Sequence, residues 1–234
     1  MRVLLMFAAL AGCGDNLYRD LPYFDGDGAH VVGAYSIDEL APDDPALLRA
    51  VDYARDAHVI TLFYGHFPPV MASYETIDAV LARADADGLP ALTFADLATQ
   101  PHESGICLSF DDTEVDAWYS LRDMLAAHGA HVTFFVTEYA SFSDDARAKL
   151  HTLLSDGNSI EAHGVTHANA VDYVASHGLD AYVTDEVEPS FQILRQDGFS
   201  PVAFAYPYGA HDEAIDDALA ARYALIRTIS GHPR

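Results

Sequence analysis

The sequence predicts a parallel α/β fold that is closed, or nearly closed, into a barrel. Short strand-like runs alternate with helical ones along the 234 residues, and this alternation is typical of parallel sheets covered by helices. Several of the runs are almost continuously apolar, as strands buried on both faces are. Half of the residues are hydrophobic, which supplies a sizeable core and excludes the disordered class.

The predicted strands are short runs rich in β-branched and aromatic residues. Val59-Ile60-Thr61-Leu62-Phe63 is the first of them, and residues 131–136 form the most continuous one. Seven runs of this kind are expected, at 59–63, 91–94, 106–110, 131–136, 158–162, 201–205 and 223–228.

Segments with helical spacing separate these strands. Ser73 can cap a helix that carries Ile77, Val80 and Leu81 on one face. Further helices are expected at 118–129, from 143 onward, at 185–196 and at 212–220. The segment at 118–129 ends at a glycine, which suits the C-cap of a helix.

The first 30 residues are predicted to lie outside the barrel. Met1-Arg2 precedes an apolar run that is too short to span a bilayer, and this run ends in Leu10-Ala11-Gly12-Cys13. The ending resembles the lipobox of bacterial lipoproteins. It predicts a lipoprotein signal peptide (1–12), a lipidated Cys13, an acidic tether (13–30) and a catalytic domain (31–234) whose motifs lie within 107–209. An ordinary signal peptide and a buried first strand are the alternatives.

This N-terminus also predicts where the protein resides. We expect export to the bacterial cell envelope, with membrane contact only through the lipid anchor. Cys107 lies in an apolar run and is expected to be a small core residue rather than half of a disulfide.

Charge and missing motifs exclude several classes of protein. Twelve Lys and Arg against 36 Asp and Glu give a net charge of −24, which repels phosphate backbones and argues against nucleic-acid binding. The sequence contains no Gly-x-Ser-x-Gly, Walker loop, Gly-x-Gly-x-x-Gly or Cys-x-x-Cys. Serine hydrolases and nucleotide-dependent enzymes are therefore poorly supported.

Three polar clusters follow directly after predicted strands. They are Asp111-Asp112, the segment His163 to His167, and Tyr206-Pro207-Tyr208-Gly209. Because the carboxyl ends of all strands in a parallel barrel open onto one face, the three clusters should converge there.

The converging residue types suit a metal site. One carboxylate and two imidazoles are a common zinc set that leaves a position for water, and a second carboxylate can act as a base on that water. The residues leave open which aspartate takes which role. Taken singly, the aspartates could form a turn or a helix cap, and the histidines could be ordinary surface or core residues.

The same motifs resemble a known family. Ser109-Phe110-Asp111-Asp112, His163-Gly164-Val165-Thr166-His167 and Phe204-Ala205-Tyr206-Pro207-Tyr208-Gly209 resemble the motifs of polysaccharide deacetylases with the NodB-homology domain, carbohydrate esterase family four. The resemblance covers about residues 58 to 229. It implies a distorted (β/α)7 barrel and a hydrolase that removes acetyl groups from N-acetylated sugars with one divalent metal.

The resemblance also implies roles for individual residues. Asp111 would be the general base, and Asp112, His163 and His167 would be the metal ligands. The backbone N–H of Tyr208 would help to hold the oxyanion. Zinc is the expected metal, although the ligand set also suits cobalt, nickel or iron.

Four residues are expected to shape the substrate pocket: Tyr206, Pro207, Tyr208 and Trp118. Trp118 has an alternative position in the core, because it belongs to an apolar stripe with helical spacing.

The sequence departs from the family pattern at several places. Thr113 stands where glycine is usual, Ala205 replaces an arginine that commonly orients the base, and Gly164 replaces a Ser or Thr that often supports the loop. The family's late Leu-x-His, which supplies the general acid, is absent. In the poly-N-acetylglucosamine deacetylase branch that histidine lies on an N-terminal strand, and Tyr64-Gly65-His66 resembles this arrangement. His66 is therefore the expected general acid, with a core or turn histidine as the alternative.

The sequence thus predicts a metal-dependent deacetylase of a polymer that contains N-acetylglucosamine, such as a biofilm glycan, a chitin-like chain or peptidoglycan. It would hydrolyse carbon–nitrogen bonds other than peptide bonds, and its partner would be the acetylated polysaccharide. An O-acetyl sugar esterase is one alternative. A catalytically impaired lipoprotein that binds carbohydrate or metal is the other.

Overall fold

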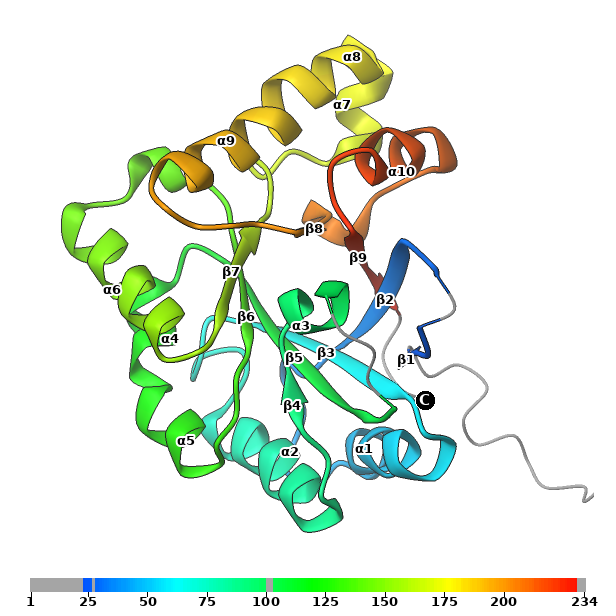
Figure 1. The fold of residues 1–234 in the computed structure, drawn as a ribbon, viewed down its shortest axis with the longest axis vertical. Coiled ribbons are helices and arrows are strands. Elements are labelled where there is room, and N and C mark those ends of the chain that lie inside the picture. Colours follow the sequence, from blue (N-terminus) through cyan, green and yellow to red (C-terminus); the bar gives the residue numbers. More distant parts are fainter. Residues whose placement is uncertain (1–22, 27, 100–102, 231–234) are drawn as a thin grey trace, which may run out of the picture.

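The computed structural model describes residues 23–26, 28–99 and 103–230. Seven parallel strands form a closed barrel (Figure 1), in which each strand pairs with the next and the last pairs with the first. The strands are β2 (Val31–Ser36), β3 (Ile60–His66), β5 (Gly105–Asp112), β6 (Thr133–Val136), β7 (Ser159–Ala162), β8 (Ala203–Ala205) and β9 (Leu225–Ser230). The predicted (β/α)7 barrel is confirmed.

The strand prediction was wrong at one position of this ring. The run at 91–94 forms only β4 (Ala91–Leu92), which pairs with the first half of β5, whereas β6 pairs with the second half. The seventh barrel strand is β2, which the sequence analysis missed. Gly33 and Ala34 interrupt its apolar run, so the run lacks the continuous β-branched character of the other strands.

Helices surround the barrel (Figure 1). Ser73 and Ser143 cap α2 (Tyr74–Asp87) and α6 (Asp144–Ser155), because their hydroxyl oxygens accept hydrogen bonds from Thr76 N and Ala146 N. The longer helices are α1 (Pro45–Ala57), α2 (Tyr74–Asp87), α6 (Asp144–Ser155), α7 (Ala170–His177), α9 (Glu188–Gln196) and α10 (Glu213–Ala220). The shorter ones are α3 (Phe94–Thr99), α4 (Val115–Ser120), α5 (Arg122–Ala127), α8 (Leu179–Tyr182), η1 (Tyr139–Ser141), the π-helical η2 (Val183–Val187) and η3 (Pro207–Gly209).

The barrel interior has its own packing. Leu62, Cys107 and Phe135 point inward, and Phe94 of α3 packs against the same interior cluster. Cys107 is buried and unpaired, as predicted. A larger apolar cluster fills the space between the outside of the barrel and its helices. The interior cluster and the outer cluster together fix the positions of the strand ends that carry the polar residues.

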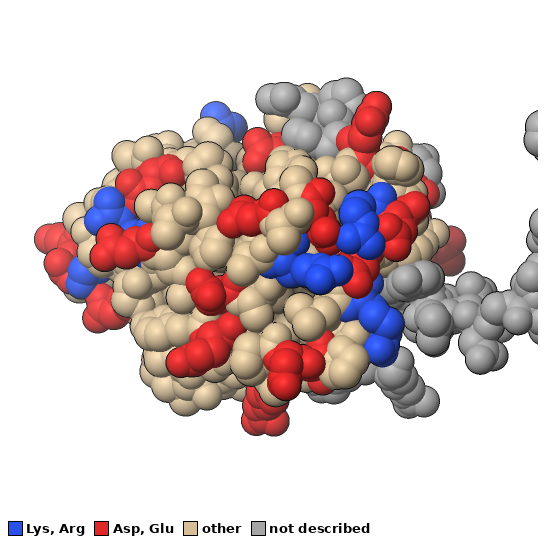
Figure 2. Space-filling model, turned by 90° about the horizontal axis from the view of Figure 1, so that it is seen from below, with Lys and Arg blue, Asp and Glu red and all other residues tan. Residues whose placement is uncertain are grey.

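Acidic and basic side chains lie next to one another on the face formed by α1, α2 and α5 (Figure 2). In Figure 2 the basic side chains on this face lie beside acidic ones. Arg55 pairs with Asp87 at 2.8 Å, and Arg83 pairs with Asp52 and, at 3.3 Å, with Asp87. This face therefore offers an anionic ligand little unpaired positive charge.

Most N-terminal predictions fall outside the described residues. This holds for the signal peptide at 1–12, for Cys13 and for most of the tether at 13–30. Within the tether range, β1 (Tyr23–Phe24) pairs antiparallel with Ile60 and Thr61 of β3. Among the described helices, none combines the length and apolar character needed to cross a bilayer.

Candidate active site

The three polar clusters converge at the carboxyl end of the barrel. They line a hollow of about 300 Å³, into which β3, β5, β7, β8 and β9 all lead. The lining residues are Tyr64, His66, Met71, Asp111, Asp112, His163, His167, Tyr206, Tyr208, Gly209, Arg227 and Ile229.

Asp112, His163 and His167 form a group of potential metal ligands. One donor atom from each lies within 4.8 Å of the others. Asp112 Oδ1 is 3.6 Å from His163 Nε2 and 3.2 Å from His167 Nε2. Burial raises the pKa of Asp112, but its hydrogen bonds to both histidines outweigh burial and hold this pKa well below its usual range. Asp112 is therefore a carboxylate at neutral pH.

The histidine tautomer also suits a metal ligand. His163 is buried, and its Nδ1 lies 2.8 Å from the carbonyl oxygen of Ala205. Because a carbonyl can only accept, Nδ1 keeps its proton, and Nε2, which faces Asp112, is the nitrogen that would give up its proton to bind a metal. Two imidazole nitrogens and one carboxylate oxygen are the donor set of a zinc-type cation with open coordination positions. The residues present therefore fit a divalent metal.

The loop that carries the two histidines rests on Glu186 of η2. The Glu186 carboxylate accepts hydrogen bonds from Val165 N at 2.8 Å, Thr166 N at 2.9 Å and Thr166 Oγ1 at 2.5 Å. Gly164 has a φ of +79°, and a Cβ there would lie 3.2 Å from Glu186 Oε2. The glycine thus lets the loop turn closely over a buried carboxylate.

Asp111 lies beside the ligand group and is almost completely buried. Its Oδ2 accepts a hydrogen bond from Arg227 Nη2 of β9. Its Oδ1 is buried and has no hydrogen-bond partner among the described residues. Arg227 therefore holds one oxygen of Asp111, and the other leaves its hydrogen-bonding capacity unused.

His66 is the direct neighbour of Asp111 in the β3–β5 register. Its Nε2 lies 3.8 Å from Asp111 Oδ2, and its Nδ1 lies 2.5 Å from Asp38 Oδ2. Asp38 Oδ1 also accepts from His66 N at 2.8 Å. Burial lowers the pKa of His66, but the hydrogen bond to Asp38 and the charge of Asp111 raise it to about 9. The imidazole is therefore protonated at neutral pH.

A protein-family model matches more than half of the chain. The family model "Polysaccharide deacetylase" matches residues 98–225. The chain belongs to the polysaccharide deacetylase family. This family consists of hydrolases, and the matched range contains all three motifs. His66 and Arg227 lie outside the matched range.

Solved structures of deacetylases share the fold. IcaB from Ammonifex degensii has a TM-score of 0.62 at 15% identity, covering 75% of this chain and 86% of its own. The deacetylase PplD from Streptococcus pyogenes has a TM-score of 0.55 at 20% identity, covering 75% and 92%. A de-N-acetylase from Aggregatibacter actinomycetemcomitans has a TM-score of 0.55 at 13% identity, covering 75% and 95%. No curated protein sequence matches the chain.

Within the motif at 206–209, Pro207–Gly209 form the 3-10 turn η3, and Tyr206 precedes it in extended conformation. Tyr208 is 64% exposed, has a φ of +59° and places its ring 4.7 Å from the ring of His167. Tyr206 is buried and donates its hydroxyl to Asp216 Oδ1 at 2.9 Å. Pro207 is buried and is not among the residues that line the hollow. Tyr208 is thus open to a ligand at the mouth, whereas Pro207 supports the turn.

Trp118 does not contribute to the substrate pocket, and that prediction was wrong. The side chain is completely buried and stacks on Phe134 at 5.1 Å between ring centroids. It lies in the apolar cluster between the barrel and its helices. The apolar stripe with helical spacing that contains Trp118 therefore indicates a position in the core.

Three residues that contact the site were not predicted from the sequence: Asp38, Glu186 and Arg227. Asp38 lies just after β2. The other clusters were found because they follow predicted strands, so Asp38 would have been found in the same way if β2 had been predicted. Arg227 is the one charged residue in the apolar run of the last strand, and a charge in a buried strand points to a partner. Glu186 had no comparable signal, because it lies among other acidic residues in a helical segment.

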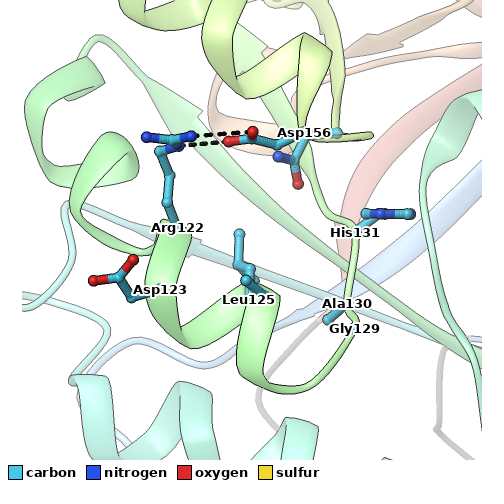
Figure 3. A pocket seen from close by; sticks show the side chains of 9 residues that line it. Arg122, Asp123, Leu125, Gly129, Ala130, His131 and Asp156 are labelled. Atoms are coloured by element: carbon cyan, nitrogen blue, oxygen red, sulfur yellow. Dashed lines mark hydrogen bonds and ion pairs between the residues drawn. The ribbon is translucent and has the colours of Figure 1, made fainter.

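A second hollow lies at the opposite end of the barrel. It is lined by residues of α5 and of the segments that lead into β6 and β7, among them Arg122, His131 and Asp156 (Figure 3). Arg122 and Asp156 pair with each other at 2.5 Å. Its carboxylates and His131 do not form a metal-ligand group among the described residues.

Proposed function

We propose that this protein is a metal-dependent deacetylase that removes N-acetyl groups from glycans containing N-acetylglucosamine. The observation that carries the proposal is the grouping of Asp112, His163 and His167 beside Asp111 and His66 in one hollow. The first three residues suit metal binding, Asp111 suits a general base, and His66 suits a general acid.

Asp112 Oδ1, His163 Nε2 and His167 Nε2 would hold the metal. A divalent cation supplies polarisation of the acetyl carbonyl and favours ionisation of the attacking water. The hydrogen bond from His163 Nδ1 to Ala205 fixes the ring in the orientation that binding requires.

Asp111 would act as the general base. Its Oδ1 accepts a proton from water while the water oxygen forms a bond to the acetyl carbon. Oδ1 suits this role because it lacks a hydrogen-bond partner among the described side chains and backbone groups, whereas Oδ2 is held by Arg227. The backbone N–H of Tyr208 would donate to the carbonyl oxygen as it becomes an oxyanion.

His66 would act as the general acid. Its Nδ1 is bound to Asp38, so Nε2 is the nitrogen that can donate a proton to the departing amine as the carbon–nitrogen bond breaks. With a pKa raised to about 9, His66 carries this proton at neutral pH. The products are acetate and a glucosamine unit.

Two further observations support an N-acetylated sugar. One structural relative is described as a de-N-acetylase. At the mouth of the hollow, Tyr208, Met71 and Ile229 are partly exposed apolar side chains that offer a surface to the faces of sugar rings.

The test is acetate release from N-acetylglucosamine oligomers by metal-stripped and zinc-, cobalt-, nickel- or iron-loaded protein. We expect release that depends on metal and is lost in Asp112→Ala, with the exposed Asp123→Ala as the matched control. Release only from O-acetylated sugars would support the esterase alternative. One bound metal without any release would support a binding role.

We further propose that the protein is an exported lipoprotein anchored through Cys13. The support is the lipobox-like sequence Leu10-Ala11-Gly12-Cys13. Fatty-acid labelling of the expressed protein should be lost in Cys13→Ala. Labelling that persists in this variant would contradict the anchor.

A further inference from the structure

The turn that carries Tyr208 packs directly against β9. Tyr208 and Gly209 both have φ values in the left-handed region, at 59° and 63°. A Cβ at Gly209 would collide with the side chain of Ile229 and would lie 2.9 Å from Ile229 N. The carbonyl oxygen of Gly209 also accepts a hydrogen bond from Thr228 Oγ1 at 2.8 Å. The strand therefore supports one side of the turn.

The two ends of the turn are fastened to one carboxylate on α10. The Tyr206 hydroxyl donates to Asp216 Oδ1 at 2.9 Å, and His211 Nδ1 lies 3.1 Å from Asp216 Oδ1 and 3.0 Å from Oδ2. Because a carboxylate only accepts, the phenol and the imidazole N–H both donate to it. The rings of Tyr206 and His211 stack, with centroids 5.4 Å apart and planes 13° apart. The residues before and after the turn are thus tied to the same side chain.

Asp216 is itself held in place by its helix. Its backbone N donates to the carbonyl oxygen of Asp212 at 2.9 Å, and the neighbouring Ile215 and Leu219 are completely buried in the apolar cluster outside the barrel. Burial and the hydrogen bond to Asp216 raise the pKa of Tyr206 well above its usual range, so the phenol keeps its proton. The link between α10 and the turn is therefore a lasting one.

We propose that Asp216 is a positioning residue that holds Tyr208 where its backbone N–H meets the oxyanion. This inference rests on the proposed function, in which that N–H is the donor. Asp216 is not among the residues that line the hollow, so it acts through the turn at 206–211. A displaced oxyanion donor lowers kcat and leaves substrate binding nearly unchanged, because the carbonyl oxygen gains its charge only on the way to the transition state.

The first experiment compares Asp216→Ala with the control Asp217→Ala in the full, metal-loaded chain. Asp217 is the next residue of α10, and it is exposed. We expect kcat of Asp216→Ala to fall by about 10- to 100-fold, with KM and metal content nearly unchanged. Asp217→Ala should match the wild type. A kcat of Asp216→Ala within about threefold of the control, or a loss confined to KM, would overturn the proposal.

Two milder variants test the hydrogen bond between Asp216 and Tyr206. The side-chain oxygen of Asp216→Asn can still accept from the phenol, so kcat should return to within about threefold of wild type. Tyr206→Phe keeps the ring and removes the hydroxyl, and it should lower kcat with KM unchanged. Because both changes break one link, Tyr206→Phe/Asp216→Ala should be no slower than Asp216→Ala.

The outcomes of these variants are distinct. An unchanged kcat in Tyr206→Phe would overturn the proposal even if Asp216→Ala fails to fold. Losses that multiply in the double variant would also overturn it, because they would show that the two side chains act separately.

A third measurement separates this inference from the proposed function. Amide hydrogen exchange in the full chain reads the turn without any substrate. We expect residues 206–211 to exchange at least about tenfold faster in Asp216→Ala than in Asp217→Ala. Equal exchange in the two variants would overturn the inference even if the wild type releases acetate. Faster exchange in a protein that releases no acetate would contradict the proposed function and support the fastening of the turn by Asp216.

Discussion

At the scale of single residues, the site is built on unusual backbone. Asp112, His167 and Tyr208 have φ values of 87°, 59° and 59°, which lie in the left-handed region that non-glycine residues rarely adopt. Two of the three are proposed metal ligands, and the third stands at the mouth of the hollow. Such conformations cost stability and persist where the surrounding structure requires them.

Tyr208 allows a test of this backbone strain. Its side chain is largely exposed, so its replacement removes little packing. Tyr208→Gly should be more stable than Tyr208→Ala by about 1 kcal/mol, because only glycine adopts the left-handed region without strain. Urea unfolding measures the difference. A Tyr208→Ala variant as stable as Tyr208→Gly would contradict the strained backbone.

The His66–Asp38 pair leads to a prediction on pH. Because the pKa of His66 is raised to about 9, the proposed proton donor carries its proton at neutral pH and loses it as the pH rises through this value. In the wild type kcat should therefore fall above about pH 9. Asp38→Asn removes the first cause that raises this pKa, so the alkaline fall should move to lower pH.

The measurement is the pH profile of kcat for both proteins. His128→Gln is the control, because His128 bonds to Asp78 and Asp85 on the outside of the barrel. His66→Gln should lower kcat by about 100-fold or more with the metal still bound. An alkaline limb at the same pH in wild type and Asp38→Asn would contradict the role of the pair.

At the scale of elements, the metal ligands depend on a loop and on the segment beneath it. Glu186→Ala removes three hydrogen bonds from the loop between His163 and His167. We expect metal affinity to weaken by about 10- to 100-fold, as it does when supporting partners of ligands are removed.

Titration with zinc and a competing chelator measures this effect. The control is Glu188→Ala, two residues further along, where the side chain pairs with Arg222 at the surface. Equal affinities in the two variants would show that the loop does not depend on Glu186.

The strength of each strand's sequence pattern decided which parts of the fold and of the site could be predicted. The proposed metal ligands could be identified from the sequence, because Asp112, His163 and His167 each lie at or just beyond the end of a strand whose apolar run is visible. The pairing of Asp111 with Arg227 was not, because it forms across the interior between residues that are distant in the chain. β2 and therefore Asp38 were missed, because a glycine and an alanine weaken the strand pattern.

At the scale of the whole molecule, a buried carboxyl group helps to join strands β7 and β8 of the barrel. Only one residue pair bridges these strands, and Glu161 Oε2 accepts instead from Val202 N at 2.7 Å and Ala203 N at 2.8 Å. Burial raises the pKa of Glu161 to about 8, although these two N–H groups lower it in part. The folded barrel therefore holds a proton that the unfolded chain loses at lower pH.

This proton makes the stability of the barrel depend on pH. The raised pKa contributes stability that is present below about pH 4.5 and is lost as the pH rises through about 8. Glu161→Gln keeps an acceptor for the two N–H groups but cannot ionise. Between these pH values the free energy of unfolding of the wild type should fall with rising pH. The free energy of unfolding of Glu161→Gln should fall less steeply, with a slope smaller by about 1.4 kcal/mol per pH unit.

Urea unfolding at pH 5, 6 and 7 measures the two slopes. Glu213→Gln is the control, because Glu213 is exposed in the first turn of α10. A Glu161→Gln variant with the same slope as the wild type would show that Glu161 is ionised in the folded barrel.

We propose that barrel closure forms a metal site from Asp112, His163 and His167 and leaves Asp111 to act as a base. Anomalous diffraction from zinc-soaked crystals would locate the ion. We expect one zinc ion about 2.0–2.2 Å from Asp112 Oδ1 and from both Nε2 atoms, without a bond to Asp111. An ion bound by Asp111, or zinc bound elsewhere with these three ligands empty, would be incompatible with the proposed site.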